Sequence, residues 1–121
     1  MADPNALDIA GELRGRATNH HGYRAAISRA YYAAFQHVRD HPTVRAAGFA
    51  PDRGPRVHSD LIAFLRRSGE RHLKQVGRDY LDALRKSRNH ADYDLHWPVT
   101  PAMADEALDL AADVIHELLP A

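Results

Sequence analysis

Residues 85 to 94, RKSRNHADYD, concentrate the side chains best suited to chemistry on a charged ligand. They include cations, an amide, an imidazole, carboxylates and a phenol. One spacing in this stretch joins Arg85 to His90 as R-x-x-x-x-H. A second spacing, R-N-x-x-D-Y, consists of Arg88, Asn89, Asp92 and Tyr93. A solvated helix end and half of a nucleic-acid site both have this composition, so the stretch alone leaves both interpretations open.

Helical geometry distinguishes the two spacings. At 100° per residue, Arg88 lies about 40° from Leu84, inside the apolar stripe of the expected helix, whereas His90 lies about 120° away. A guanidinium on such a stripe must be paired, or must face a ligand or a partner subunit. Asp92, one turn later, can pair with Arg88. The geometry favours the Arg88 spacing, and the structural alternative is an ion pair that finishes the helix.

Length and composition place limits on the class of protein. The chain has 121 residues, 45% of them hydrophobic, which predicts one folded domain over residues 1–121. It has no cysteine, so disulfides, thiolate metal sites and a cysteine nucleophile are excluded. No leader-like segment and no apolar run of roughly 20 residues is present, so we expect a cytoplasmic protein with no membrane association.

Charge is balanced overall but uneven along the chain. Sixteen basic residues face sixteen acidic ones, which argues against strong, non-specific binding of nucleic acid over the whole surface. Basic residues concentrate between 53 and 90, whereas the stretch from 100 onward holds no lysine or arginine and is acidic. This distribution predicts one basic face and one acidic helix, or simply two solvated surfaces of opposite sign.

Apolar spacing of three to four residues predicts helices throughout, and no segment alternates with the period of a strand. We expect helices over 4–17, 23–40, 56–68 and 70–92, with a fifth after Thr100 and a long loop over 41–56. Asp3 and Pro4 would begin the first helix, and Thr100 would cap the last. The predicted fold is all-α, an up-and-down bundle of four to five helices.

Metal chemistry is weakly supported. A ferritin-like site needs Glu-x-x-His pairs on facing helices, and the chain has none. His37 and His41 share one helical face, but Pro42 follows at once. We expect no metal and no cofactor.

Two adjacent tyrosines lie on the strongest helical stripe. Tyr31 is at its centre and Tyr32 flanks it by about 100°. Such a pair packs in a core and an interface, or offers a ring on which a base or nucleotide stacks. Both interpretations stay open.

Three segments in order, YRAAISRAYYAAFQ (23–36), RVHSDLIAFL (56–65) and LDALRKSRNHADYDL (81–95), resemble the HEPN superfamily. The likeness covers roughly residues 10 to 119. More narrowly, the chain is similar to a short branch with an R-A-Y-Y-A-x-F helix and a late R-x-x-A-D-Y motif. The resemblance implies a helical bundle, usually a homodimer with a composite cleft. It also implies metal-independent ribonucleases of toxin–antitoxin, CRISPR and other defence systems, often paired with a nucleotidyltransferase.

The family's catalytic motif is an arginine with a histidine five positions later. Placed on Arg88, the motif has Tyr93 at the histidine position, whereas placed on Arg85 it has His90. Cleavage of RNA by its own 2′-hydroxyl needs a proton acceptor of near-neutral pKa and a cation for the phosphorane oxygens. Arg88 can supply the cation, but a tyrosine, with an ordinary pKa of about 10, is a poor base at neutral pH. His58 can supply an imidazole instead, or is a cap or core histidine.

We therefore expect a cleft near the end of the 70–92 helix that binds RNA or a nucleotide. The expected cleft residues are Tyr31, Tyr32, Arg88, Asn89 and Asp92. Two functions remain open: a ribonuclease or its weakened relative, with Arg88, Tyr93 and His58 in the catalytic roles, and a non-catalytic module that docks a nucleotidyltransferase. Homodimerisation is expected because Arg24 and Arg88 are polar groups on apolar stripes.

Overall fold

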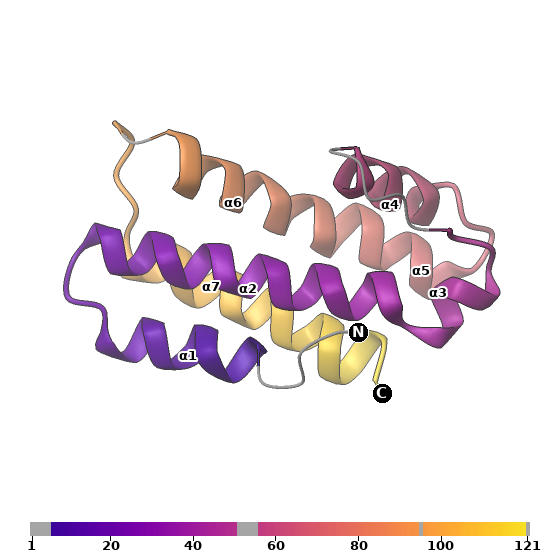
Figure 1. Ribbon diagram of the computed structural model, residues 1–121, viewed down its shortest axis with the longest axis horizontal. Helices are drawn as coiled ribbons and strands as arrows, with labels where there is room; N and C mark the ends of the chain where they lie inside the picture. Colours follow the sequence, from indigo (N-terminus) through magenta and orange to yellow (C-terminus); the bar gives the residue numbers. More distant parts are fainter. Residues whose placement is uncertain (1–5, 51–55, 95, 121) are drawn as a thin grey trace.

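A computed structural model describes residues 6–50, 56–94 and 96–120, and every regular element in these ranges is helical (Figure 1). The chain begins with α1 (Ala6–Arg16) and α2 (His20–Asp40). Asn19 is extended and its side chain accepts hydrogen bonds from the backbone N–H groups of His21 and Gly22, so it starts α2 three residues earlier than the sequence predicts. The predicted caps Asp3 and Pro4 lie outside the described residues.

The expected loop over 41–56 contains a short helix, α3 (Pro42–Ala46). His41 caps this helix because its Nδ1 accepts from the backbone N–H of Thr43. Pro42 ends α2 but suits the first turn of the next helix, where its missing N–H costs no hydrogen bond. The prediction of one uninterrupted loop was therefore wrong. α4 (Val57–Arg66) follows, within the predicted range.

Three consecutive helical segments form one long rod, which carries Arg88. It consists of α5 (Arg71–Gln75), a π-helical turn η1 (Val76–Leu81) and α6 (Asp82–Tyr93), which confirms a helix over the predicted 70–92. Glu70 caps its start by accepting from the backbone N–H of Leu73. Gly77 allows α4 to approach closely, since a Cβ built there would lie 2.6 Å from the Cβ of Leu65.

The last helix begins as predicted. Thr100 is extended and its hydroxyl accepts from the backbone N–H of Met103, and Pro101 occupies the first turn. α7 (Pro101–Ala112) continues into a second π-helical turn, η2 (Asp113–Leu118). Its acids at 105, 106, 109, 113 and 117 are all exposed, so the predicted acidic helix is present.

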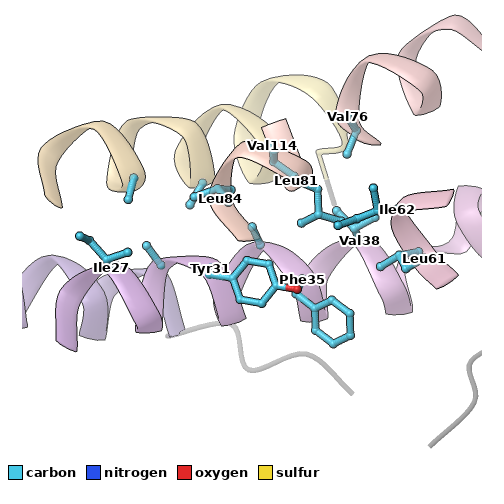
Figure 2. Packing of buried hydrophobic residues seen from close by; sticks show 14 of the residues in the cluster. Ile27, Tyr31, Phe35, Val38, Leu61, Ile62, Val76, Leu81, Leu84 and Val114 are labelled. Carbon is cyan, nitrogen blue, oxygen red and sulfur yellow. The ribbon is translucent and has the colours of Figure 1, made fainter. Parts of the chain in front are cut away.

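The helices form an up-and-down bundle centred on α2, which runs the length of the molecule and packs against α1, α6 and α7 (Figure 1). α4 packs on the start of the rod at one end. The predicted stripe of α2 supplies much of the core: Ile27, Tyr31, Phe35 and Val38 are buried in one cluster with Leu81, Leu84 and Val114 (Figure 2). In the described part of the chain, no helix is long and apolar enough to cross a membrane.

Candidate functional site

Arg88 lies in the interior of the bundle and is surrounded by phenol rings. Its side chain is 7% exposed, which confirms its predicted place on the buried stripe of α6. The guanidinium carbon is 5.2 Å from the ring centre of Tyr31, 5.4 Å from that of Tyr32 and 5.7 Å from that of Tyr93. One guanidinium N–H also donates to the Tyr93 hydroxyl at 3.1 Å. The negative faces of these rings favour the buried cation.

The charge of Arg88 is only partly neutralised. The carboxylate of Asp92 lies 3.7 Å from its nearer nitrogen, and that same oxygen accepts from the Ser28 hydroxyl at 3.3 Å. The Nε atom of Arg88 is buried and has no hydrogen-bond partner in the described residues. A buried donor without a partner costs free energy, so an added acceptor at this position would stabilise the site.

His58, at the start of α4, joins the same group of side chains. Its Nδ1 lies 2.6 Å from the Tyr31 hydroxyl, and its ring stacks on Phe35 at 4.2 Å between centres. Burial lowers the pKa of His58, and the nearby charges of Arg88, Arg85 and Arg39 lower it further. His58 is therefore neutral at neutral pH.

The hydrogen-bond partners assign the tautomer of His58. Burial raises the pKa of Tyr31 to about 12, against an opposing effect of Arg88, so this phenol keeps its proton. Tyr31 is fully buried, and its proton needs an acceptor, which His58 Nδ1 provides. The hydrogen of the neutral imidazole then lies on Nε2. His58 presents a donor, as Arg88 does, and both suit an anion.

We call Tyr31, Tyr32, His58, Arg88, Asp92 and Tyr93 the Arg88 cluster. Tyr32 is 37% exposed and Tyr93 is 73% exposed, so the cluster presents aromatic rings to solvent above a buried cation. Asn89, which was expected in the cleft, is exposed, and no hydrogen bond joins its side chain to the cluster in the described structure.

The two spacings of the 85–94 stretch diverge in space. The charge of Arg85 lowers the pKa of both Tyr31 and His58, so Arg85 faces the cluster. His90 instead lies beside Asp94, at 3.6 Å, and edge-on to Trp97, at 5.5 Å between ring centres. Arg85 and His90 therefore do not converge on one site, because five residues turn a helix by about 140°.

Several side chains that lie next to the Arg88 cluster were not identified from the sequence. Ser28, Phe35 and Arg39 reach the cluster from α2 by a hydrogen bond to Asp92, a ring contact with His58 and a charge near His58. Ser28 and Phe35 lie three residues before and four after Tyr31. Helical neighbours of a candidate residue are the signal that would have found them.

The structural role expected for Arg24 requires a correction. This residue was expected to mark a subunit interface, but its guanidinium donates to backbone carbonyls of His90, Ala91, Asp94 and Trp97. These acceptors are at the carboxyl end of α6 and just beyond it, where helix carbonyls lack partners. The terminal nitrogens of Arg24 thus find acceptors within one chain, so its place on the stripe does not by itself require a second subunit.

The described residues offer no group of three or more His, Asp or Glu side chains able to hold a metal ion. The two histidines considered for metal binding contact the end of the chain instead. His37 Nε2 is paired with the carbonyl of Leu119, and His41 Nε2 lies 3.0 Å from that of Pro120.

A model of the HEPN domain matches residues 15–119, which is nearly the whole chain. The chain belongs to the HEPN domain family. Comparison with curated proteins and with solved structures finds no significant match.

Tyr93, at the end of α6, lies five positions after Arg88, where the resemblance noted in the sequence leads us to expect a histidine, and its hydroxyl accepts a hydrogen bond from Arg88. The imidazole whose pKa is lowered by the charge of Arg88 is that of His58, which α4 contributes. Cation and imidazole thus come from two helices and not from one motif.

Proposed function

We propose that this HEPN-domain protein binds RNA or a nucleotide at the Arg88 cluster, with a phosphate at Arg88. One observation carries the proposal. Arg88 is a nearly buried cation whose Nε lacks a partner and whose only carboxylate neighbour in the described residues is 3.7 Å away. A phosphate oxygen would supply the missing acceptor and balance the remaining charge.

The surrounding side chains suit the rest of a nucleotide. Tyr93 and Tyr32 expose ring faces beside Arg88, and bases of any identity stack on such rings. The Nε2–H of His58 adds a donor from α4, and the guanidinium of Arg85 on α6 adds positive charge near it. The ligand would therefore lie with its base over the tyrosines and its phosphate toward α6.

Binding is better supported than catalysis. Transfer of the 2′-hydroxyl proton needs a free acceptor, and the Nδ1 lone pair of His58 is already used by Tyr31. With hydrogen on Nε2, His58 stabilises an anion but does not accept a proton. The histidine of the family motif is replaced by Tyr93.

The direct test compares binding of labelled single-stranded RNA to the wild type, Arg88→Gln and Arg88→Lys by fluorescence anisotropy. Arg88→Gln should weaken binding at least about tenfold, because charge-assisted hydrogen bonds contribute about 1.5–3 kcal/mol. Arg88→Lys keeps the positive charge but lacks the paired N–H donors of a guanidinium, so its affinity should lie between those of the wild type and Arg88→Gln. Arg16→Gln, which removes an exposed cation from α1, is the matched control. Equal affinity of wild type and Arg88→Gln would refute the proposal.

A metal-independent ribonuclease is the second candidate, favoured by the neutral imidazole of His58 in the cluster. Cleavage would require Nε2 of His58 to lose its hydrogen to the other ring nitrogen. If so, cleavage of RNA in EDTA should be lost in His58→Ala and in Arg88→Gln, and retained in His90→Ala. Loss of cleavage in His90→Ala alone would assign the chemistry to the Arg85–His90 spacing.

We also propose that the protein is a cytoplasmic homodimer of a prokaryotic toxin–antitoxin or defence system, with a nucleotidyltransferase as a possible partner. The support is membership of the HEPN family, since Arg24 no longer requires a second subunit. Sedimentation equilibrium should give about twice the chain mass at micromolar concentration. A clean monomer at about 100 µM would exclude an ordinary stable interface.

A further inference from the structure

A second cationic surface lies on the same rod as Arg88. Arg71, Lys74 and Arg78 are three and four residues apart, which places them on one side of the helix, and all three are exposed. Together with Gln75 they line a hollow of about 370 Å³. Every lining side chain carries N–H donors, and none is a carboxylate. The chemistry of this hollow suits an anion.

The charges of this surface are poorly neutralised within the chain. Arg71 and Lys74 make no ion pair in the described structure. Arg78 pairs with its neighbour Asp79 at 2.9 Å, but both side chains are largely exposed, and such pairs contribute little. The carboxylate of Glu70 is occupied as the helix cap at the Leu73 N–H. Like charges at this spacing repel one another, and a bound anion would relieve that repulsion.

The end of the neighbouring helix carries two more exposed cations. The close approach at Gly77 brings the backbone of Arg66 beside η1, 3.2 Å from the position of a Cβ on Gly77. Arg66 and Arg67 are both exposed at the end of α4. We call Arg66, Arg67, Arg71, Lys74 and Arg78 the α4–α5 basic surface.

The distance between the two cationic regions indicates the size of the ligand. Lys74 and Arg88 are fourteen residues apart on one rod, or roughly 21 Å along its axis at 1.5 Å per residue, and they lie on different sides of it, since Lys74 is exposed and Arg88 is buried against α2. A mononucleotide reaches only one of them. A stacked strand, at 3.4 Å per nucleotide, needs at least about six nucleotides to pass from one to the other. Arg85 adds positive charge close to the Arg88 cluster.

We propose that Arg71, Lys74 and Arg78 bind the backbone of the same RNA strand whose phosphate lies at Arg88, so that the ligand is a strand of several nucleotides and not a mononucleotide. The proposal rests on the proposed function of the Arg88 cluster. Guanidinium forks and an amide in one hollow suit phosphate oxygens, which accept paired hydrogen bonds.

An acidic partner surface is the competing occupant, and the exposed acids of α7 and η2 would provide one on a second copy. Such a contact joins two different faces, which forms a ring or an open chain unless a two-fold axis pairs both faces at once. The presence of the Arg88 cluster on the same rod favours RNA.

The test uses Arg71→Gln/Lys74→Gln, with Arg16→Gln/Lys86→Gln as a control of equal charge. Arg16 is exposed on α1, and Lys86, whose side chain is largely exposed, pairs with Asp82. Anisotropy is measured with a labelled RNA dinucleotide and with a strand of about twelve nucleotides. For the long strand the double variant should bind about 25-fold more weakly at 0.1 M salt, with a salt slope lower by about 1.4, from about 0.7 released ions per lost contact. Its affinity for the dinucleotide should match the wild type.

The outcomes separate this proposal from the function on which it rests. If Arg88→Gln loses RNA but Arg71→Gln/Lys74→Gln binds the long strand as the control does, the Arg88 site stands and the second contact is refuted. If the wild type binds neither RNA, both proposals fail. Sedimentation velocity compares the assembly states of the two proteins. If the wild type forms an assembly that the double variant does not form, the basic surface belongs to a protein contact, which also overturns the proposal.

Discussion

Among single residues, His58 has the pKa that reports most directly on Arg88 and on the cations near the Arg88 cluster. Its pKa is lowered first by burial and then by Arg88, Arg85 and Arg39. In the unfolded chain this histidine returns to a pKa of about 6.5 and binds more protons than in the folded state. Its contribution to stability is therefore complete above that value and is lost as the pH falls through 6.5 toward the folded pKa.

Removing the charge of Arg88 should raise the pKa of His58 toward its ordinary value. The increase should be partial in Arg88→Gln, because burial, the larger cause, remains. An NMR titration of the His58 ring protons gives the midpoint directly. Arg16→Gln should leave the midpoint unchanged. An unchanged midpoint in Arg88→Gln would show that the two side chains do not interact as described.

The sequence predicts some residues of the site but not their neighbours. Helical angles place Arg88 inside and His90 away from it, because a stripe fixes which side of a helix faces the core. They do not fix what lies opposite. Arg24 was correctly placed on the interior stripe, yet its acceptors come from the end of α6, which periodicity in α2 cannot indicate. The pairing of His58 with Tyr31 likewise depends on how α4 packs.

At the scale of elements, Arg24 fixes the end of α6. Its guanidinium donates to the carbonyls of Ala91 and Asp94 at the point where α6 ends with Tyr93. Arg24→Met keeps the aliphatic stem and should lower the free energy of unfolding by about 2–3 kcal/mol. Urea unfolding measures this, with Arg29→Met on the exposed side of α2 as a control that should change stability by less than about 0.5 kcal/mol. A similar small loss in both variants would contradict the capping role.

Gly77 determines how closely α4 and the rod approach. A methyl group there would meet the Cβ of Leu65 at 2.6 Å, the backbone N of Arg66 at 3.2 Å and the carbonyl oxygen of Ile62 at 3.3 Å. Gly77→Ala should therefore destabilise the protein by about 1–3 kcal/mol, despite the better helix propensity of alanine. Gly11→Ala in α1, where nothing lies within 4 Å, should be neutral or stabilising by up to about 1 kcal/mol. Thermal unfolding of both variants tests this, and a stabilised Gly77→Ala would show that the helices have room to separate.

The predicted helices were largely confirmed because strong apolar spacing leaves few alternatives. The stripe of α2 and the cap of α7 by Thr100 followed directly from residue types. Two features could not be predicted in this way. α3 was missed because Pro42 stops one helix and starts the next. The π-helical turns η1 and η2 keep an apolar spacing of three to four, so the sequence does not distinguish them from α-helix.

At the scale of the whole molecule, a net charge of zero conceals a polar arrangement. α7 and η2 carry five exposed acids and no lysine or arginine, whereas the α4–α5 basic surface lies on helices above α2 in the view of Figure 1, where only Asp60, Glu70 and Asp79 are exposed acids. A molecule of this kind binds a polyanion on one side without attracting it over its entire surface. The bundle thus supplies both the buried cation and the exposed rings of the proposed site.

The central claim is that a phosphate binds at Arg88. The most direct test is an NMR titration of the arginine Nε–H groups with an RNA dinucleotide. Nε of Arg88 is buried without a hydrogen-bond partner, so its resonance should shift strongly as a phosphate oxygen becomes its acceptor. Nε of Arg24 is equally buried, but its guanidinium is directed at the backbone carbonyls at the end of α6, so its resonance should not move. Shifts confined to Arg24, Trp97 and the His90 ring, with Arg88 unchanged, would contradict the account.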